Sequence, residues 1–136
     1  MNVFTYGSLM YPEVWDRVVR GQYRGAAARL QGWARRAIAD ASYPGAIRVI
    51  GGQIDGRLWF DVDADDLARL DAFESTEYQR VGVRVQLCSG QDDPIEAQLY
   101  EFLSPNRLLA CDWDTAGFER QYLADFAQVH GAGASR

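Results

Sequence analysis

Two alternating segments near the middle of the chain constrain the fold most strongly. Residues 80–87 place apolar side chains at every second position, namely Val81, Val83, Val85 and Leu87. Residues 95–100 repeat the alternation after a turn-forming stretch at 89–94. Because successive side chains of a strand point to opposite faces, this pattern predicts two half-buried strands joined as a hairpin. The chain must therefore build a sheet with one face against a core.

Further strands are expected on either side of this hairpin. Residues 3–6 form a short β-branched and aromatic run that ends at Gly7-Ser8, which predicts a first strand followed by a tight loop. Small and aromatic residues interrupted by glycines favour two irregular strands within 22–38, and residues 41–45 read as a turn. Another strand is predicted over 54–62, broken by a tight turn at Asp55-Gly56.

Three segments have helical spacing. Apolar residues recur three and four positions apart over 11–19, and Pro12 is tolerated in the first turn of a helix. Asp63 is a natural N-cap for a helix that continues through Leu67, Leu70 and Phe73. A last helix, expected to pack on the sheet, is predicted from Asp114 to about Val129.

Short strands with a few helices, and no regular alternation between them, indicate an α+β fold: a small mixed β-barrel or sheet flanked by short helices. A length of 136 residues is typical of one domain. We expect that domain to span residues 1–130 and to be followed by a flexible C-terminal tail at 131–136, which is rich in glycine and alanine.

Composition excludes several function classes. The 14 basic residues are all arginines, so neither lysine Schiff-base chemistry nor a Walker-type phosphate lysine is available. A net charge of -5 with dispersed arginines argues against nucleic acid and anionic membranes as partners. No apolar run approaches the length of a membrane span and no signal peptide opens the chain, which favours a cytoplasmic location.

Metal and cofactor chemistry also finds little support. Cys88 and Cys111 are too far apart for a zinc knuckle and are read as small buried apolar residues. His130, the single histidine, lies in the last few residues and is poorly placed for a catalytic triad. We therefore expect no metal and no cofactor. The four tryptophans, Trp15, Trp33, Trp59 and Trp113, are expected in the core or in the walls of a cleft.

Glu74 is the first candidate for chemistry. At about 100° per residue it falls on the same helix face as Leu67 and Leu70, which point inward. A carboxyl group held there must be partnered, solvated by a cleft or raised in pKa, and a raised pKa suits general acid–base work near neutrality. The alternative is that the helix has already ended and Glu74 lies in solvent. Glu77 is read as a surface residue.

The second candidate is the loop Tyr6-Gly7-Ser8-Leu9, between the first strand and the first helix. A glycine lets the backbone turn and leaves successive N–H groups free to bind carboxylates or oxyanions. A simple turn that ends a strand would look the same.

These residues together resemble a known family. The loop Phe4-Thr5-Tyr6-Gly7-Ser8-Leu9, the element Leu70-Asp71-Ala72-Phe73-Glu74 and the run Tyr78-Gln79-Arg80 before an alternating strand occur in the order typical of the gamma-glutamylcyclotransferase-like (AIG2-like) family. Tyr43-Pro44-Gly45 and Tyr100 extend the resemblance, which spans roughly residues 3–126. One departure is Ser75, where the family often has glycine.

The resemblance implies a small mixed barrel with a cleft between the first loop and the glutamate. It also implies cyclisation of a gamma-glutamyl compound to 5-oxoproline, with release of an amine or amino acid. Glu74 would then be the catalytic acid–base, and six residues would bind substrate: Tyr6, Gly7, Ser8, Leu9, Tyr78 and Tyr100. The expected partner is a small gamma-glutamyl molecule, and the protein would be a monomer or homodimer.

The chemistry is compatible with the residues present. The substrate's own α-amine attacks its γ-carbonyl, so a folded conformer and one proton carrier suffice, without a nucleophilic serine or cysteine. Two alternatives stay open: a non-catalytic module that binds a small carboxylate in the same cleft, and a hydrolase that releases free glutamate.

Overall fold

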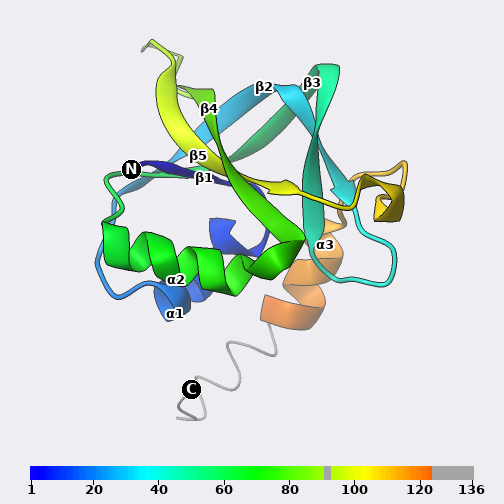
Figure 1. The fold of residues 1–136 in the computed structure, drawn as a ribbon, viewed down its shortest axis with the longest axis horizontal. Coiled ribbons are helices and arrows are strands. Elements are labelled where there is room, and N and C mark those ends of the chain that lie inside the picture. Colours follow the sequence, from blue (N-terminus) through cyan, green and yellow to red (C-terminus); the bar gives the residue numbers. More distant parts are fainter. Residues whose placement is uncertain (91–92, 124–136) are drawn as a thin grey trace.

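The computed structural model describes residues 1–90 and 93–123 (Figure 1). Within these residues the strands form one closed barrel in the order β1-β3-β2-β4-β5. Their bounds are β1 Val3–Thr5, β2 Gly25–Ala37, β3 Pro44–Trp59, β4 Tyr78–Leu87 and β5 Ile95–Phe102. All neighbours pair antiparallel except β1 and β5, which run parallel where Val3 faces Gln98. The α+β fold with a small mixed barrel and the β4–β5 hairpin are confirmed.

Short helices cover one side of this barrel. They are α1 Pro12–Val18, α2 Ala64–Glu74 and α3 Thr115–Phe118. α1 and α2 lie side by side below the barrel, and α3 lies close to the point where the described part of the chain ends (Figure 1). Single 3₁₀ turns occupy Ser8–Met10, Ser75–Glu77 and Pro105–Arg107, and a π-helical segment, Glu119–Leu123, follows α3. The two turns next to Glu74 and Gly7 shape the cavity described below.

The core has two parts that share β1. Phe4 belongs to the cluster inside the barrel, together with Leu30 and Trp33, whereas Val3 belongs to the cluster between barrel and helices. Because neighbouring residues of a strand point to opposite faces, one short strand serves both clusters. In the helix layer Trp15 stacks on Trp59 with ring centroids 4.4 Å apart. All four tryptophans are buried, as expected.

Two strand boundaries predicted from the sequence are wrong. Residues 25–37 form one strand, because the positive φ of Gly32 (+84°) accommodates a β-bulge without ending the pairing with β3. Asp55-Gly56 also lies inside a strand, because β3 runs from Pro44 to Trp59 without a break. The turn predicted at 41–45 therefore ends before Pro44, and the strand predicted over 54–62 is part of a longer one. Gly56 is needed there because a Cβ would collide with the Thr5 carbonyl oxygen, and Asp55 forms a cross-strand ion pair with Arg29 (2.8 Å).

The cysteines and the last helix also differ from expectation. Cys88 and Cys111 are exposed and not buried, because Cys88 follows the end of β4 and Cys111 lies in an irregular segment before α3. Asp114 does cap a helix, accepting a hydrogen bond from the Gly117 N–H. That helix gives way to the π-helical segment at Glu119. The rest of the predicted helix, His130 and the tail at 131–136 lie outside the described residues.

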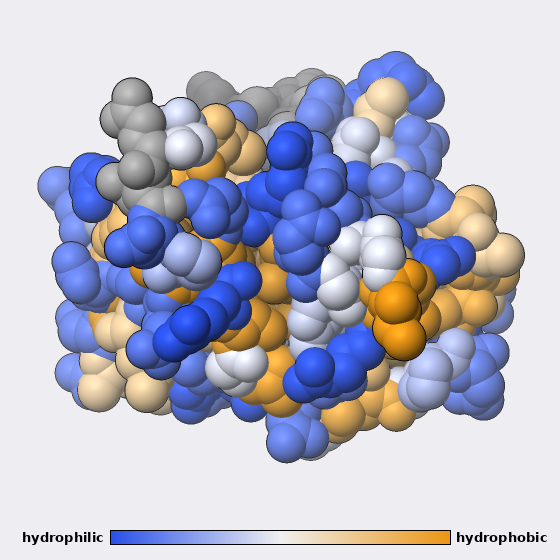
Figure 2. Space-filling view, turned by 90° about the horizontal axis from the view of Figure 1, so that it is seen from above, coloured by the Kyte–Doolittle hydropathy of each residue, from blue (hydrophilic) through white to orange (hydrophobic). Residues whose placement is uncertain are grey.

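The face of the molecule turned away from α1 and α2 is shown in Figure 2. Polar side chains dominate it, and apolar ones are scattered among them. Ile50, on a protruding segment of β3, has a fully exposed side chain. Among the described helices none is long and apolar enough to cross a membrane.

Candidate active site

One cavity of about 300 Å³ lies between the loop after β1, the C-terminal end of α2 and the start of β4. All the site residues expected from the sequence line it, namely Tyr6, Gly7, Ser8, Leu9, Glu74, Tyr78 and Tyr100. The loop and Glu74 are about seventy residues apart in the chain but line the same cavity. This is the arrangement that the resemblance implies.

Glu74 is the last residue of α2. The helix keeps its register to this point, so Glu74 extends the face on which Leu67 and Leu70 are buried. The alternative in which the helix ends earlier and leaves Glu74 in solvent is therefore excluded. Ser75 then turns the chain towards β4 with a φ of +67°, a value that glycine adopts more easily than serine.

The carboxyl group of Glu74 is poorly solvated. Burial and the nearby negative charge of Glu77 raise its pKa from 4.5 to about 8. Among the hydrogen bonds of the described residues, none involves this carboxyl group. Glu74 is thus a titratable group whose pKa lies close to neutrality, with its oxygens available to a ligand.

The loop opposite Glu74 is fixed by hydrogen bonds to its backbone carbonyl oxygens. The Trp59 indole N–H donates to the Leu9 carbonyl oxygen (3.2 Å), and Arg35 donates to the Tyr6 carbonyl oxygen (3.0 Å). The carbonyls of Gly7 and Ser8 accept from the next turn. In the part of the chain that the structure describes, the backbone N–H groups of Gly7, Ser8 and Leu9 have no protein acceptor. The loop can therefore offer donors to an anionic or carbonyl oxygen.

Three tyrosines surround Glu74. The Tyr6 hydroxyl donates to the Tyr100 carbonyl oxygen (2.5 Å), Tyr78 donates to the Pro44 carbonyl oxygen (2.7 Å), and Tyr100 donates to Asp71 Oδ1 (2.6 Å). Burial raises the pKa of all three hydroxyls, and the proximity of Glu74 raises it further. All three therefore stay protonated near neutral pH.

Glu77 lies at the rim of the cavity, contrary to the expectation of a plain surface residue. Its side chain is 34% exposed, and its carboxylate accepts hydrogen bonds from Arg107 (3.0 Å) and Tyr43 (2.9 Å). These two contacts hold its pKa below the usual range. Only its spacing of three residues from Glu74 could have pointed to this position, since Arg107 and Tyr43 are about thirty residues away in sequence.

Other residues that the sequence did not assign to the site complete the cavity wall. Tyr43 and Pro44 come from the start of β3 and the turn before it, and the half-exposed Phe73 comes from the last turn of α2. The sequence predicts a turn at Tyr43-Pro44, but no local pattern indicates that this segment faces Glu74. The rim is therefore partly aromatic.

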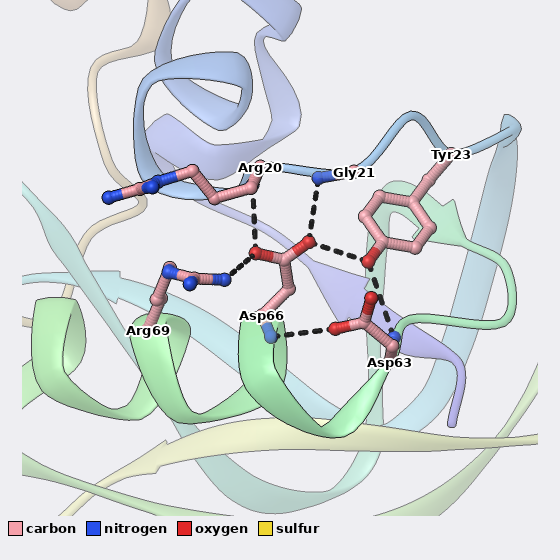
Figure 3. Close-up of polar contacts among 6 residues, drawn as sticks. All are labelled: Arg20, Gly21, Tyr23, Asp63, Asp66 and Arg69. Carbon is pink, nitrogen blue, oxygen red and sulfur yellow. Dashed lines mark hydrogen bonds and ion pairs between the residues drawn. The ribbon is translucent and has the colours of Figure 1, made fainter.

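The other end of α2 is anchored by Asp66 (Figure 3). This buried carboxylate accepts hydrogen bonds from the backbone N–H groups of Arg20 and Gly21, from the Tyr23 hydroxyl (2.6 Å) and from Arg69 (2.7 Å). Burial alone would raise its pKa, but these donors hold the pKa far below its ordinary value. The network fixes where α2 starts and hence where it presents Glu74.

The fold and the cavity define a class of small barrel proteins with a buried carboxyl group opposite an amide-rich loop. The family model for gamma-glutamyl cyclotransferase, AIG2-like, matches residues 3–115. The chain therefore belongs to this family.

Similar proteins agree with this assignment. The chain is 28% identical over 129 residues to AIG2-like protein D of Arabidopsis thaliana, which covers 94% of this chain and 85% of that protein. A solution structure of a protein from Arabidopsis thaliana superimposes with a TM-score of 0.72 at 25% identity, covering 95% of this chain and 87% of that one. A structure described as gamma-glutamyl cyclotransferase superimposes with a TM-score of 0.66 at 16% identity, covering 96% and 86%. At that identity the last comparison concerns the fold alone.

Proposed function

We propose that the protein is a gamma-glutamyl cyclotransferase in which Glu74 is the general acid–base. The observation that carries this proposal is a carboxyl group with a pKa of about 8 inside a cavity, facing a loop with free N–H groups. Membership of the family supports the reaction class. The substrate would be a gamma-glutamyl compound with a free α-amine, and the products 5-oxoproline and an amine or amino acid.

Each bond change can be assigned. The α-nitrogen of the substrate attacks the γ-carbonyl carbon, a new carbon–nitrogen bond closes the five-membered ring, and the bond to the leaving nitrogen breaks. The α-nitrogen gives up two protons as it changes from an ammonium to the ring N–H, and the leaving nitrogen takes up two as it changes from an amide N–H to an ammonium. Ionised Glu74 can carry these protons one at a time from the first nitrogen to the second. The net proton change is zero, so a single carboxyl group is sufficient.

The pKa of Glu74 suits both transfers. An α-amino group has a pKa of about 8 in peptides, close to the value for Glu74. A proton can therefore move between the two groups at small free-energy cost. An ordinary glutamate, with a pKa of about 4.3, would be a weaker base by several powers of ten.

The loop and the cavity supply the remaining contributions. The N–H groups of Gly7, Ser8 and Leu9 can stabilise the negative charge that develops on the γ-carbonyl oxygen. The cavity walls restrict the substrate to a folded conformer, and orientation of this kind can give effective molarities of about 10⁵–10⁸ M.

The experiment incubates wild type, Glu74→Gln and Glu96→Gln with gamma-glutamyl amino acids, glutathione and gamma-glutamyl amines. Both 5-oxoproline and free glutamate are quantified. Glu96 is an exposed residue of β5 and is the matched control.

We expect 5-oxoproline from wild type and from Glu96→Gln, and a rate lower by about 10²–10⁴ for folded Glu74→Gln. Free glutamate in place of 5-oxoproline would indicate a hydrolase. Binding of these compounds without any turnover would indicate the carboxylate-binding module, and full activity of Glu74→Gln would refute the role of Glu74.

A further inference from the structure

The three tyrosine hydroxyls around Glu74 share a hydrogen-bond polarity. A phenol has one proton to donate. The proton of Tyr78 is directed to a backbone carbonyl, that of Tyr6 to another, and that of Tyr100 to a carboxylate. None of these acceptors can donate in return. Any further group that contacts these hydroxyl oxygens, such as a ligand, must therefore donate a hydrogen bond to them.

Asp71 enforces this polarity at Tyr100. It lies one helical turn before Glu74 on α2, but it lines a separate shallow hollow on the other side of Tyr78 and Tyr100. Tyr100 therefore stands between Asp71 and the cavity that holds Glu74.

A pair of contacts with Arg80 keeps Asp71 in its acceptor form. The guanidinium donates through Nε to Oδ1 (3.0 Å) and through Nη2 to Oδ2 (3.2 Å). The paired carboxylate is ionised near neutral pH and can only accept. The Tyr100 hydroxyl proton is consequently fixed on the Asp71 side, at 2.6 Å.

We propose that the hydroxyl oxygens of Tyr100 and Tyr78 form an acceptor site for the substrate's α-ammonium beside Glu74. In this site Asp71 is a positioning residue, because it orients the hydroxyl of Tyr100. This inference rests on the function proposed above and adds the subsite that orients the substrate. In this arrangement the hydroxyl oxygens of the tyrosines and the carboxyl group of Glu74 face the ammonium. The N–H groups of the loop at Gly7 face the γ-carbonyl oxygen of the substrate.

The selectivity of such a subsite follows from its polarity. An ammonium has three N–H donors and a positive charge, which match acceptors next to a carboxylate. An analogue without the amino group leaves buried acceptors without donors, and unsatisfied buried groups are costly. The subsite should therefore discriminate between ligands that differ only in the α-ammonium.

The experiment compares two probes by titration calorimetry in a Glu74→Gln background, where turnover is suppressed. The probes are gamma-glutamyl-alanine and glutaryl-alanine, which is the same molecule without the α-amino group. The quantity measured is the ratio of their dissociation constants. Structural damage weakens both probes alike, so this ratio reports on the ammonium subsite and not on folding.

Five proteins are compared: the Glu74→Gln background, and that background with Tyr100→Phe, with Asp71→Asn, with both, or with a control substitution. The matched control is Tyr11→Phe, which removes a hydroxyl that donates to the Glu119 carboxylate (2.7 Å) outside the cavity. We expect the background and the control to prefer gamma-glutamyl-alanine by about tenfold or more, as for hydrogen bonds to a charged group.

Tyr100→Phe should remove most of this preference and Asp71→Asn part of it. The double variant should lose no more than Tyr100→Phe alone, because Asp71 acts through Tyr100. Equal affinity of the background for both probes, an unchanged preference in Tyr100→Phe, or additive losses would overturn the proposal. Each of these results is independent of whether wild type forms 5-oxoproline, so failure of the subsite and failure of the proposed reaction are distinguishable.

Discussion

Glu74 and Glu77 lie three residues apart but have opposite pKa shifts. Glu74 lines the cavity and has no hydrogen-bond donor among the described residues, so burial raises its pKa to about 8. Glu77 is bound by Arg107 and Tyr43, so its pKa is lowered and it stays negatively charged. The ionised neighbour then adds to the elevation at Glu74. One turn of chain therefore contains both the proton carrier and a charge that tunes it.

Removing the charge at position 77 should shift the pH dependence of the reaction. In wild type, kcat/KM should rise with pH as Glu74 ionises around pH 8. In Glu77→Gln the like charge is lost and Arg107 loses its partner, so the pKa of Glu74 should fall and the rise should move to lower pH. The pH profile of kcat/KM measures this, and an unchanged or higher midpoint would contradict the coupling.

The backbone of Ser75, directly after Glu74, is strained. Its φ of +67° and ψ of -169° lie in a region that glycine adopts readily and serine does not. Relief of strain worth about 1–3 kcal/mol, partly offset by the entropy of glycine, should make Ser75→Gly about 1 kcal/mol more stable. Urea unfolding measures the change, with Ser75→Ala as a control that keeps the strain. A less stable Ser75→Gly would mean that the serine hydroxyl near the Glu77 N–H outweighs the strain.

At the scale of elements, α2 connects the Asp66 network to the cavity. Asp66 fixes the first turn of the helix against the segment between α1 and β2, and Glu74 lies at the far end. The helix spans eleven residues, so its start and its end cannot shift independently. The position of the proton carrier is therefore set by contacts that do not touch the cavity.

Loss of the Asp66 carboxylate should be costly. Asp66→Asn cannot accept all the hydrogen bonds that the carboxylate accepts, so buried donors lose partners and the free energy of unfolding should fall by about 2–4 kcal/mol. Asp65→Asn, an exposed change in the same turn, should cost less than about 1 kcal/mol. Chemical denaturation compares the two, and equal small losses would show that the network contributes little.

The sequence predicted those elements whose signal is local. Alternation within ten residues defined β4, and an N-cap with helical spacing defined α2 and the inward position of Glu74. The turn predicted at Asp55-Gly56 is wrong because the glycine is required by the close approach of the Thr5 backbone, about fifty residues away in the chain. Glu77 was missed for the same reason, because its partners come from distant loops. Long-range contacts of this kind leave little trace in local sequence.

For the whole molecule, the cavity and the stability are coupled through Glu74. Its pKa is about 8 in the folded protein and near 4.5 when unfolded. Between these values the unfolded state is ionised and the folded state is protonated, so unfolding releases a proton and stability falls as pH rises. Asp66 and Asp71 act in the opposite direction, since their pKa values are lowered by folding and their contribution is lost in acid.

Glu74→Gln should therefore stabilise the protein at high pH. At pH 8.5 the variant avoids the burial of a charge and should unfold with a free energy about 2–4 kcal/mol above that of wild type. At pH 4.5 both side chains are neutral when folded, and the difference should be small. Urea unfolding of both proteins at the two pH values tests this, and a difference independent of pH would contradict the raised pKa.

Titration of the Glu74 carboxyl carbon by NMR shows whether this side chain holds a proton at neutral pH. The protein is labelled with ¹³C at the glutamate side chains, and the Glu74 signal is assigned by its loss in Glu74→Gln. We expect a midpoint near pH 8. A midpoint near 4.5 would show an ordinary solvated carboxylate and would contradict the mechanism.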